Sequence, residues 1–285
     1  MNKFFAVGFC VVLTLPGCKP EKPLVEVPMT KAMTGQAAPC EQLVWGGFPR
    51  SLNPPKEKTT SFVCRDFYAL NFNVVRGTSD WVVEKLLSED LNKPDAKLVG
   101  SEVRPDGEIP KSRQTTTSDY RGIGYGKGFF AAPDNFRYSE IAYSYSFYLT
   151  NIYPQHPDQE ATIKLLEDWI RSEAKKRKEI YIISGPVYQD GNGLGWVGQS
   201  DKPSANGDAA RKGKVQVPSS VFKILFSPST KKAIAFEIPN APVSTSLGSY
   251  LVPIAVLERK TGLIFFGDLP VAEQQSIKSG TLSSW

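Results

Sequence analysis

The side chains that could perform acid–base chemistry or contact a phosphate lie within residues 124–171 of this 285-residue chain. The chain has one histidine, His156, and an imidazole is the side chain best suited to accept a proton near neutral pH. Glu167 and Arg171 are four residues apart, so a helix would place them on one face. Lys127 is charged, but an exposed ammonium with a pKa of about 10.4 is a poor base. The region therefore offers one candidate base and one carboxylate–guanidinium pair.

The segment GYGKGFFAAPDNF, residues 124–136, resembles the Gly-Tyr-Asp-Arg-Gly-His segment of the DNA/RNA non-specific endonuclease family. Four residues of that pattern are kept, namely Gly124, Tyr125, Gly128 and Ala131. Three differ, since the Asp, Arg and His places hold Gly126, Lys127 and Phe129. In the family this His removes a proton from the attacking water. A phenyl ring cannot accept a proton. The resemblance therefore implies a nuclease fold that lacks the general base of its family.

The resemblance extends in the same order over nearly the whole domain. It covers residues 43–49 with VWGGFP, 76–86 around Trp81, 149–155, 181–188 (YIISGPVY), 217–226, 233–240 (AIAFEIPN) and 258–266. It implies an α+β protein with the ββα-metal nuclease fold, in which a central, mostly antiparallel sheet is flanked by helices. It also implies phosphodiester hydrolysis assisted by magnesium or another divalent cation.

The remaining site residues follow from the same resemblance. Asn151, Glu167 and Arg171 stand at matching positions of the family's active site. The place of the metal-binding Asn holds Gln159, whose carbonyl oxygen lies on a longer stem and would ligate with poorer geometry. Glu160 is the alternative oxygen ligand if the register is shifted by one residue.

His156 precedes the helix that would carry Glu167, so a base relocated onto it is one hypothesis, and an exposed loop residue is the other. Phe129 and Phe130 are more typical of a core than of a base-stacking pair.

Nucleic-acid binding through the phosphate backbone would depend on positive charge. Lys127 keeps the positive charge of the family's Arg but cannot make its two parallel hydrogen bonds to a phosphate. A solvated lysine beside a glycine turn is the simpler interpretation. Arg171 would contribute to the same groove. The long Gly- and Asn-containing segment 189–214 is predicted to be a surface loop whose basic end, Arg211 and Lys212, could contact DNA or RNA phosphates.

Hydrophobic periodicity predicts the elements that position these residues. Strands are expected over 67–75, 179–183, 221–226 and 233–238. The clearest helix starts after Pro157 with Asp158 as its N-cap. It places four apolar residues on one face, Ile163, Leu166, Ile170 and Ala174. It ends in a basic run, residues 175–178, that suits a helix C-terminus.

The N-terminus indicates export and a lipid anchor. Residues 1–17 have the pattern of a signal peptide, and Leu15-Pro16-Gly17-Cys18 resembles a lipobox with Cys18 as the lipidated residue. Secretion with an unmodified Cys18 is the alternative. Lys19 after the cysteine favours, by resemblance to enterobacterial lipoproteins, the outer membrane of a bacterial cell envelope. Residues 18–39 form a Pro-rich tether, 40–270 the domain, and 271–285 a loose polar tail on which Trp285 could dock.

Two cysteines remain for the exported domain, Cys40 and Cys64. Leftover thiols in an exported protein usually pair, and this disulfide would contribute about 3 kcal/mol by closing a loop of about 25 residues. Two separately buried thiols are the alternative. The net charge of +5 falls by one when Lys3 is lost with the signal, which permits a polyanionic partner without requiring one.

Three functions from different classes fit these observations. The favoured hypothesis is a pseudonuclease that binds nucleic acid with little or no cleavage, because losing a general base costs roughly 10²- to 10⁴-fold in rate. A slow nuclease with an unconventional base and an envelope scaffold that uses the fold for protein contacts are the other two.

Overall fold

The computed structural model describes residues 40–54, 59–121, 124–198, 214–279 and 285. These residues belong to one compact unit of the chain. The expected signal peptide, the tether with Cys18, and the basic pair Arg211 and Lys212 lie outside the described residues. No helix in the described ranges is long and apolar enough to cross a bilayer.

The centre of the fold is a six-stranded sheet in which every neighbouring pair is antiparallel. In spatial order its strands are β11 (Lys232–Pro239), β10 (Ser220–Ser227), β7 (Glu179–Val187), β4 (Thr78–Leu87), β3 (Tyr68–Asn73) and β2 (Thr60–Cys64). Four of these strands were predicted from the sequence. The antiparallel sheet and the mixed α+β class are therefore confirmed.

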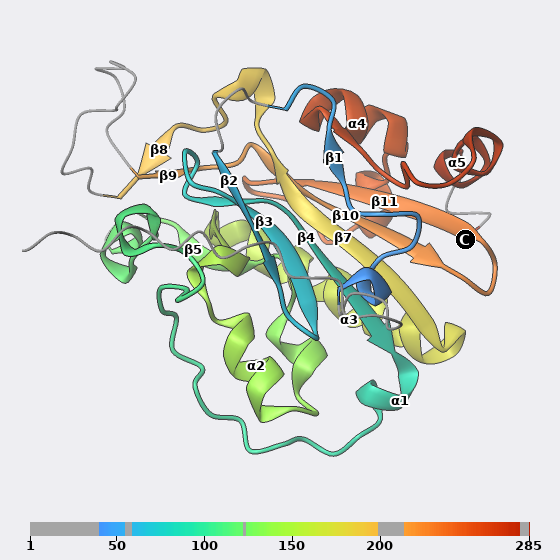
Figure 1. The fold of residues 1–285 in the computed structure, drawn as a ribbon, viewed down its shortest axis with the longest axis horizontal. Helices are drawn as coiled ribbons and strands as arrows, with labels where there is room; N and C mark the ends of the chain where they lie inside the picture. The colour runs from blue at the N-terminus through green and yellow to red at the C-terminus, as the bar shows by residue number, and fades with distance from the viewer. Residues whose placement is uncertain (1–39, 55–58, 122–123, 199–213, 280–284) are drawn as a thin grey trace, which may run out of the picture. The chain divides into compact units, whose positions relative to one another are not determined.

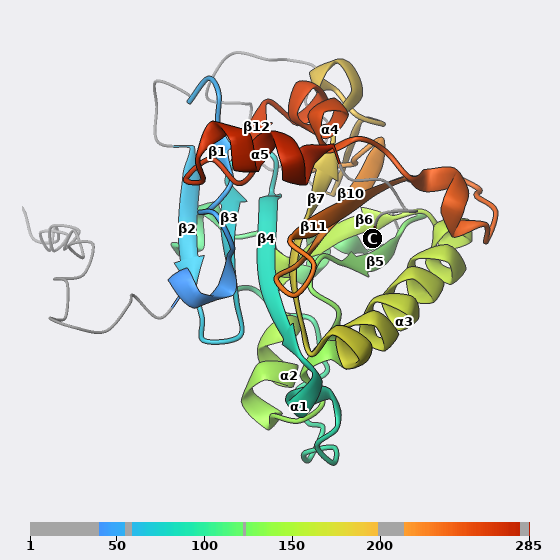
Figure 2. The ribbon, with the colours of Figure 1, turned by 90° about the vertical axis from the view of Figure 1, so that its right-hand side faces the viewer.

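Helices cover both faces of this sheet (Figures 1 and 2). Because side chains alternate along each strand, Val82 and Leu86 of β4 face one core while Trp81 and Val83 face the other. The first core is closed by α2 (Glu140–Ser146) and α3 (Glu160–Arg177), the second by α4 (Ile254–Thr261) and α5 (Val271–Lys278). The short helix α1 spans Ser88–Leu91.

Three small two-stranded ribbons lie outside the central sheet. They pair β1 (Arg50–Ser51) with β12 (Leu263–Ile264), β5 (Gly126–Phe129) with β6 (Ile152–Gln155), and β8 (Trp196–Val197) with β9 (Val215–Gln216). Short 3₁₀ helices connect the elements: η1 (Glu41–Leu43), η2 (Lys111–Arg113), η3 (Thr117–Tyr120), η4 (Pro133–Phe136), η5 (Leu149–Asn151), η6 (Pro157–Gln159), η7 (Gln189–Gly191) and η8 (Leu247–Tyr250).

Helix α3 carries the predicted apolar face, because Ile163, Leu166, Ile170 and Ala174 are all buried. The predicted N-cap was wrong. A 3₁₀ turn, η6, intervenes before α3, and His156 caps that turn by accepting a hydrogen bond from the Asp158 amide. The basic end is partly neutralised, since Glu173 bonds to Lys176 and Arg177.

The C-terminal segment differs from the loose tail that was expected. Residues 271–278 form α5, which follows Pro270, and Ile277 is buried in the second core. The helix is also held by polar contacts, because Gln274 donates to the Leu269 carbonyl and Lys278 lies 2.7 Å from Glu258. Trp285 packs against the first core, and the guanidinium of Arg177 lies 4.3 Å from its ring centroid.

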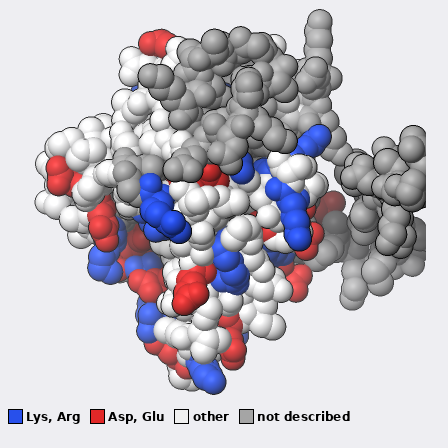
Figure 3. Space-filling view, turned by 90° about the vertical axis from the view of Figure 1, so that its left-hand side faces the viewer, with Lys and Arg blue, Asp and Glu red and all other residues white. Residues whose placement is uncertain are grey.

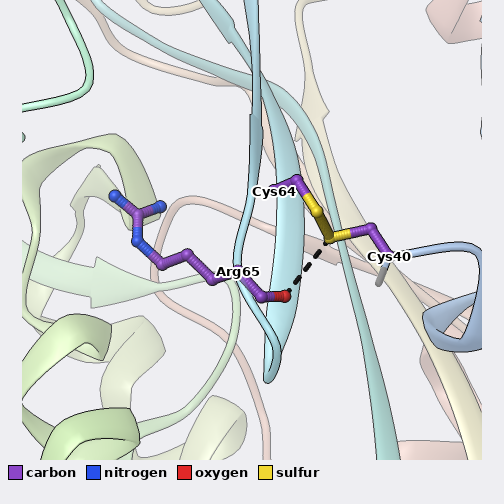
Figure 4. The surroundings of a disulfide bond; sticks show 3 residues. All are labelled: Cys40, Cys64 and Arg65. Atoms are coloured by element: carbon purple, nitrogen blue, oxygen red, sulfur yellow. Dashed lines mark hydrogen bonds between the residues drawn. A yellow bond between two sulfur atoms is a disulfide. The ribbon is translucent and has the colours of Figure 1, made fainter. Parts of the chain in front are cut away.

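Cys40 and Cys64 form the predicted disulfide, with their Cα atoms 5.8 Å apart. It joins the residue before η1 to the last residue of β2. Figure 4 shows the Cys40 sulfur beside the carbonyl oxygen of Arg65, 3.3 Å away. A disulfide sulfur carries no proton, so this is a close contact and not a donated hydrogen bond.

Candidate active site

The β5–β6 ribbon holds the segment that resembles the nuclease motif. Its register pairs Gly128 with Tyr153 and Phe129 with Ile152. Directly opposed residues point to the same side of a ribbon, and successive residues point to opposite sides. Phe129 and the Gly128–Tyr153 pair therefore lie on different faces of the ribbon.

Phe129, which was expected at the position of the family's base, lies in a small hydrophobic cluster. It is half-buried beside Val103 and Ile152, and its ring meets Phe147 edge-on with centroids 5.3 Å apart. Phe130 is buried on the other side, with its ring centroid 5.0 Å from that of Tyr153. Both phenylalanines are thus occupied in protein packing.

Asn151 holds the turn that follows Phe129. Its side-chain oxygen accepts a hydrogen bond from the Ala131 amide, and its side-chain nitrogen donates to the carbonyls of Ala131 and Ser146. Its backbone carbonyl also accepts from the Phe130 amide. Because Asn151 is fully buried and all these bonds are internal, it shapes the site without facing a substrate.

Gln159, which was expected at the position of the family's metal ligand, is also fully buried. Its carbonyl oxygen accepts hydrogen bonds from the Tyr153 hydroxyl at 3.1 Å and from the Gln155 amide at 3.4 Å. Its nitrogen donates to the carbonyls of Ile238 and Pro239. An amide oxygen has two lone pairs, and both are used here. Gln159 therefore has no oxygen lone pair to give to a cation.

Tyr153 fills the space next to this amide. A Cβ atom added at Gly128 would lie 2.3 Å from a Tyr153 ring carbon, so the phenol packs directly on the glycine backbone. Glu160, the alternative ligand, is exposed on the first turn of α3, where the helix dipole disfavours a cation. The described part of the chain has no group of three His, Cys, Asp or Glu residues placed to hold a metal. These residues do not fit the divalent ion that the fold implies.

His156 lies beyond the opposite end of the ribbon from Phe129. The ladder runs from Phe129 opposite Ile152 to Gly126 opposite Gln155, a separation of roughly 10 Å at about 3.4 Å per residue. The His156 ring accepts the Asp158 amide through Nδ1 and lies edge-on to Tyr125. His156 is therefore a capping residue, remote from the place of the missing base.

Glu167 takes part in a buried charge network beneath α3. The Lys223 ammonium lies 3.5 Å from the Glu167 carboxylate and donates to the Phe130 carbonyl at 2.6 Å and the Ser184 hydroxyl at 3.4 Å. Lys223 is 5% exposed. Burial raises the pKa of Glu167, while Lys223 and Arg171 oppose that shift. Lys223 thus ties α3 and the sheet to the backbone beside Phe129.

A second carboxylate, Glu84 on β4, belongs to the same network. One of its oxygens accepts from the Asn135 amide at 2.9 Å, and the other is buried without a partner in the described structure. Burial raises the pKa of Glu84 to about 7, against the opposing effects of Lys223 and Asn135. Burial therefore favours the protonated form of this carboxyl more than in an exposed glutamate.

Arg171 completes the network from α3. Its guanidinium donates to the side-chain amide oxygen of Asn135 and to Asp168, and it lies 4.0 Å from Asp134. Its charge is therefore compensated. Lys127 is exposed on β5. Among the described side chains visible on the left-hand face of Figure 1, basic ones are separated by acidic and uncharged ones (Figure 3).

The predictions missed Glu84, Asn135 and Lys223. A signal for two of them is present in the sequence. Glu84 stands between Val82 and Leu86, and Lys223 between Val221 and Leu225. Because every second side chain of a strand points to the same face of the sheet, each of these charges lies on the inward face of its strand. A charge at such a position is expected to be paired.

Comparison with known proteins gives a consistent picture. A family model described as DNA/RNA non-specific endonuclease matches residues 53–272. The chain is 32% identical over 227 residues to human (Homo sapiens) mitochondrial Endonuclease G, covering 77% of this chain and 74% of that protein. It is 31% identical over 248 residues to a nuclease of Nostoc sp., covering 82% and 83%. Among solved structures, the EndoG chain in the crystal structure of the EndoG/EndoGI complex superposes with a TM-score of 0.65 at 25% identity, over 87% of this chain and 100% of that chain.

Proposed function

Because the chain belongs to the DNA/RNA non-specific endonuclease family, we propose that it is a pseudonuclease, which binds nucleic acid and cleaves it slowly or not at all. Family nucleases need a base and, in general, a divalent metal ion. This chain has Phe129 in place of the base, and Phe129 packs against Phe147. A phenyl ring has no lone pair with which to accept a proton.

The proposal rests mainly on the hydrogen bonds of the Gln159 side chain, which are all made within the protein. Both lone pairs of its carbonyl oxygen accept internal hydrogen bonds, and the residue is 0% exposed. A metal could bind there only after those bonds were broken, which leaves the buried Tyr153 hydroxyl donor unsatisfied at a cost of about 1–3 kcal/mol. Gln155 would keep its shorter hydrogen bond to the Tyr153 hydroxyl. The loss of the base and the closure of the ligand position both act against hydrolysis.

Binding to a nucleic-acid backbone is the activity that this proposal retains. The relatives are nucleases by name, and Lys127 on β5 is an exposed cation at the place of the family's Arg. Arg171 contributes little, because Asp168 and Asp134 compensate its charge. Binding should then be weak, sequence-independent and sensitive to salt, as expected for a few phosphate contacts.

Cleavage is tested with the full-length protein on plasmid DNA and on RNA, with magnesium or manganese. We expect turnover at least about 10²-fold below that of a family nuclease with an intact His, the smallest cost of losing a base. The Phe129→His variant and the Phe129→His/Gln159→Asn variant are assayed beside it. Robust metal-dependent cleavage by the wild type would overturn the proposal. If His156→Ala abolished that cleavage, the base would be assigned to His156.

Binding is measured by fluorescence anisotropy with short DNA and RNA duplexes at several salt concentrations. Lys127→Ala should weaken binding and flatten the logarithmic salt slope by roughly one unit. Lys231→Ala is the matched control, because Lys231 is an exposed lysine on the β10–β11 turn, away from the ribbon. No binding by the wild type even at low salt would leave protein contacts, as in an envelope scaffold, as the use of the fold.

We further propose that Cys18 is lipidated and anchors the protein to the bacterial cell envelope, at the outer membrane. The support is the sequence of residues 15–18 and the Pro-rich segment that follows it. Fractionation of cells that express the wild type or Cys18→Ser tests this directly. The wild type should sediment with membranes and the variant should not. Equal solubility of the two proteins would contradict the anchor.

A further inference from the structure

The two outer strands of the central sheet, β11 and β2, differ in what lies beside them. Leu251, in the segment after η8, forms a bridge with Phe236 of β11. The neighbouring Val252 amide donates to the Ala235 carbonyl at 3.0 Å. Beside β2, at the left of the sheet in Figure 2, no strand of the described residues pairs on the outer side. One edge of the sheet is therefore covered by the chain, and the other is open in the part that the structure describes.

The register of β2 shows which of its backbone groups are unused. Just before β2, the Thr59 carbonyl accepts a hydrogen bond from the Val74 amide. Hydrogen-bonded residues alternate along an antiparallel ladder, and β2 pairs with β3 in continuous register. The odd-numbered residues of β2 therefore bond to β3. The even-numbered ones direct their amide and carbonyl groups outward, and no hydrogen bond among the described residues uses these groups. They are Thr60, Phe62 and Cys64.

The side chains of β2 lack the features that usually keep an open edge from pairing. Such features are a lysine or proline on the edge, an inward-pointing charge or a β-bulge. The five residues of β2, Thr-Ser-Phe-Val-Cys, contain none of them. Phe62, at the centre, is 51% exposed, although its ring centroid lies 5.2 Å from that of Phe48. The open edge is therefore uncharged and partly apolar.

We propose that β2 pairs with β2 of a second copy of this chain, antiparallel about a two-fold axis beside Phe62. In this register the two Phe62 residues exchange both of their backbone hydrogen bonds, and Thr60 of each copy lies opposite Cys64 of the other. Each outward donor thereby meets an acceptor. Directly opposed side chains lie on the same face of a sheet, so the two exposed Phe62 rings meet and bury apolar surface.

Two observations favour a second copy over another kind of strand. The outward residues are symmetric about Phe62, so a copy related by a two-fold axis presents its groups at matching positions. The edge also carries no charge that would select an acidic or a basic peptide. Because β11 is covered, the described sheet has one open edge per chain. Pairing therefore stops at two copies and gives a closed dimer instead of a fibre.

The dimer should be weak. A stable interface buries about 1,600 Å² in total, and one pair of five-residue strands with a single aromatic contact buries less. We expect a dissociation constant between about 1 and 200 μM. The dimer would then form only where the protein is concentrated.

Sedimentation velocity measures this equilibrium, with the full chain carrying Cys18→Ser so that the proposed lipid anchor does not interfere. Adding Phe62→Lys should weaken the dimer at least about tenfold, because the aromatic pair is lost and two like charges stand opposite each other. Leu165→Lys is the matched control and should leave the dimer unchanged. Leu165 is an exposed apolar residue of α3, and Trp169 one turn away packs on Phe236 of the covered strand β11.

A pair of cysteine variants tests the register. Opposed residues of a hydrogen-bonded pair have Cα atoms about 5.5 Å apart, which suits a disulfide, whose Cα atoms lie about 4.4–6.8 Å apart. Phe62→Cys should therefore cross-link two copies under mild oxidation. Thr59→Cys should not, because in this register Thr59 lies opposite Arg65 and roughly 20 Å along the strand from its own equivalent. Peptide mapping identifies the linked residues and checks that Cys40 and Cys64 stay bridged.

The proposal is overturned if the Cys18→Ser chain stays monomeric at about 500 μM, well above the expected dissociation constant. It is also overturned if Phe62→Lys dimerises like the parent, or if Thr59→Cys cross-links as fast as Phe62→Cys. Thermal denaturation of Phe62→Lys checks that a lost dimer is not a lost fold, and the cross-link gives the answer if that variant unfolds. A monomer that dimerises once residues 19–35 are deleted would assign the edge to the chain's own N-terminal segment and would equally overturn the proposal.

Discussion

The β5–β6 ribbon and the end of β7 differ in how their buried polar groups are bonded. At the ribbon, Gln159 and Asn151 are fully buried and use their hydrogen bonds on the protein itself. At the end of β7, the buried Tyr188 hydroxyl makes no hydrogen bond of good geometry with the described residues, and the Arg76 guanidinium is its charged neighbour. A buried polar group with good internal hydrogen bonds stabilises the fold, whereas one without them costs free energy.

The same contrast holds for charge. Glu84 and Lys223 are buried between α3 and the sheet, and the Glu167 side chain beside them is 16% exposed. The pair Arg50–Asp268 is exposed on both sides, and Lys260–Glu237 has an exposed lysine. A buried ion pair affects stability strongly, because removal of one partner leaves the charge of the other buried and uncompensated. Exposed pairs contribute little. We therefore expect the charged residues next to the nuclease-like ribbon to affect the stability of the fold more than the exposed pairs do.

The largest effect is expected from Lys223→Met. The variant keeps a side chain of similar length but leaves Glu167 and the Phe130 carbonyl without the ammonium. The free energy of unfolding should fall by about 3–5 kcal/mol, measured by urea denaturation.

Lys231→Met, at an exposed turn, is the control and should change the free energy of unfolding by less than about 0.5 kcal/mol. The double variant Lys223→Met/Glu167→Gln should recover part of the loss, because it removes the uncompensated carboxylate. A Lys223→Met protein as stable as the wild type would show that Lys223 is not needed to compensate the neighbouring carboxylates.

The pH dependence of stability gives the next largest effect. Burial raises the pKa of Glu84 from 4.5 to about 7, so the folded state binds this proton more tightly than the unfolded state. The contribution of Glu84 is therefore fully present below about pH 4.5 and is lost as the pH rises toward 7. The loss amounts to up to about 3 kcal/mol.

Urea denaturation of the wild type and Glu84→Gln between pH 4.5 and 8 checks this effect. The stability of the variant relative to the wild type should increase with pH, because the amide cannot ionise. Glu167, Lys223 and Arg171 face the same network and remain in both proteins, so the difference isolates Glu84. A difference independent of pH would contradict the raised pKa.

Much of the fold could be predicted from the sequence, but less of the site. Strand alternation and the spacing of Ile163 to Ala174 gave the antiparallel sheet and the buried face of α3. The function of Gln159 could not be inferred the same way. Its burial depends on Tyr153 from β6 and on carbonyls at residues 238 and 239. Such contacts between distant segments are set by tertiary packing and leave no local pattern.

A smaller effect is expected from Gly128→Ala at the ribbon. The added methyl would meet the Tyr153 ring at 2.3 Å, and overpacking of this kind should cost about 1–2 kcal/mol for a single methyl. Gly128→Ala/Tyr153→Ala should show a favourable coupling in a double-mutant cycle, because removal of the ring leaves room for the methyl. Strictly additive effects would indicate that Tyr153 does not fill the space beside Gly128.

The smallest effect on stability, and the sharpest contrast with the ribbon, is expected at Tyr188. Tyr188→Phe removes a hydroxyl that makes no hydrogen bond of good geometry with the described residues, its polar neighbour being the Arg76 guanidinium. The free energy of unfolding should stay within about 0.5 kcal/mol of the wild-type value or rise slightly, since a buried, poorly bonded polar atom is gone.

Tyr153→Phe is the matched variant at the ribbon. It removes a hydroxyl that bonds Gln159 and Gln155, and it should lower the stability by about 1–2 kcal/mol. Thermal and urea denaturation of the pair compares two buried tyrosines that differ in their partners. Equal losses would mean that the Tyr188 hydroxyl is bonded within the protein as firmly as the Tyr153 hydroxyl, with Arg76 as its partner.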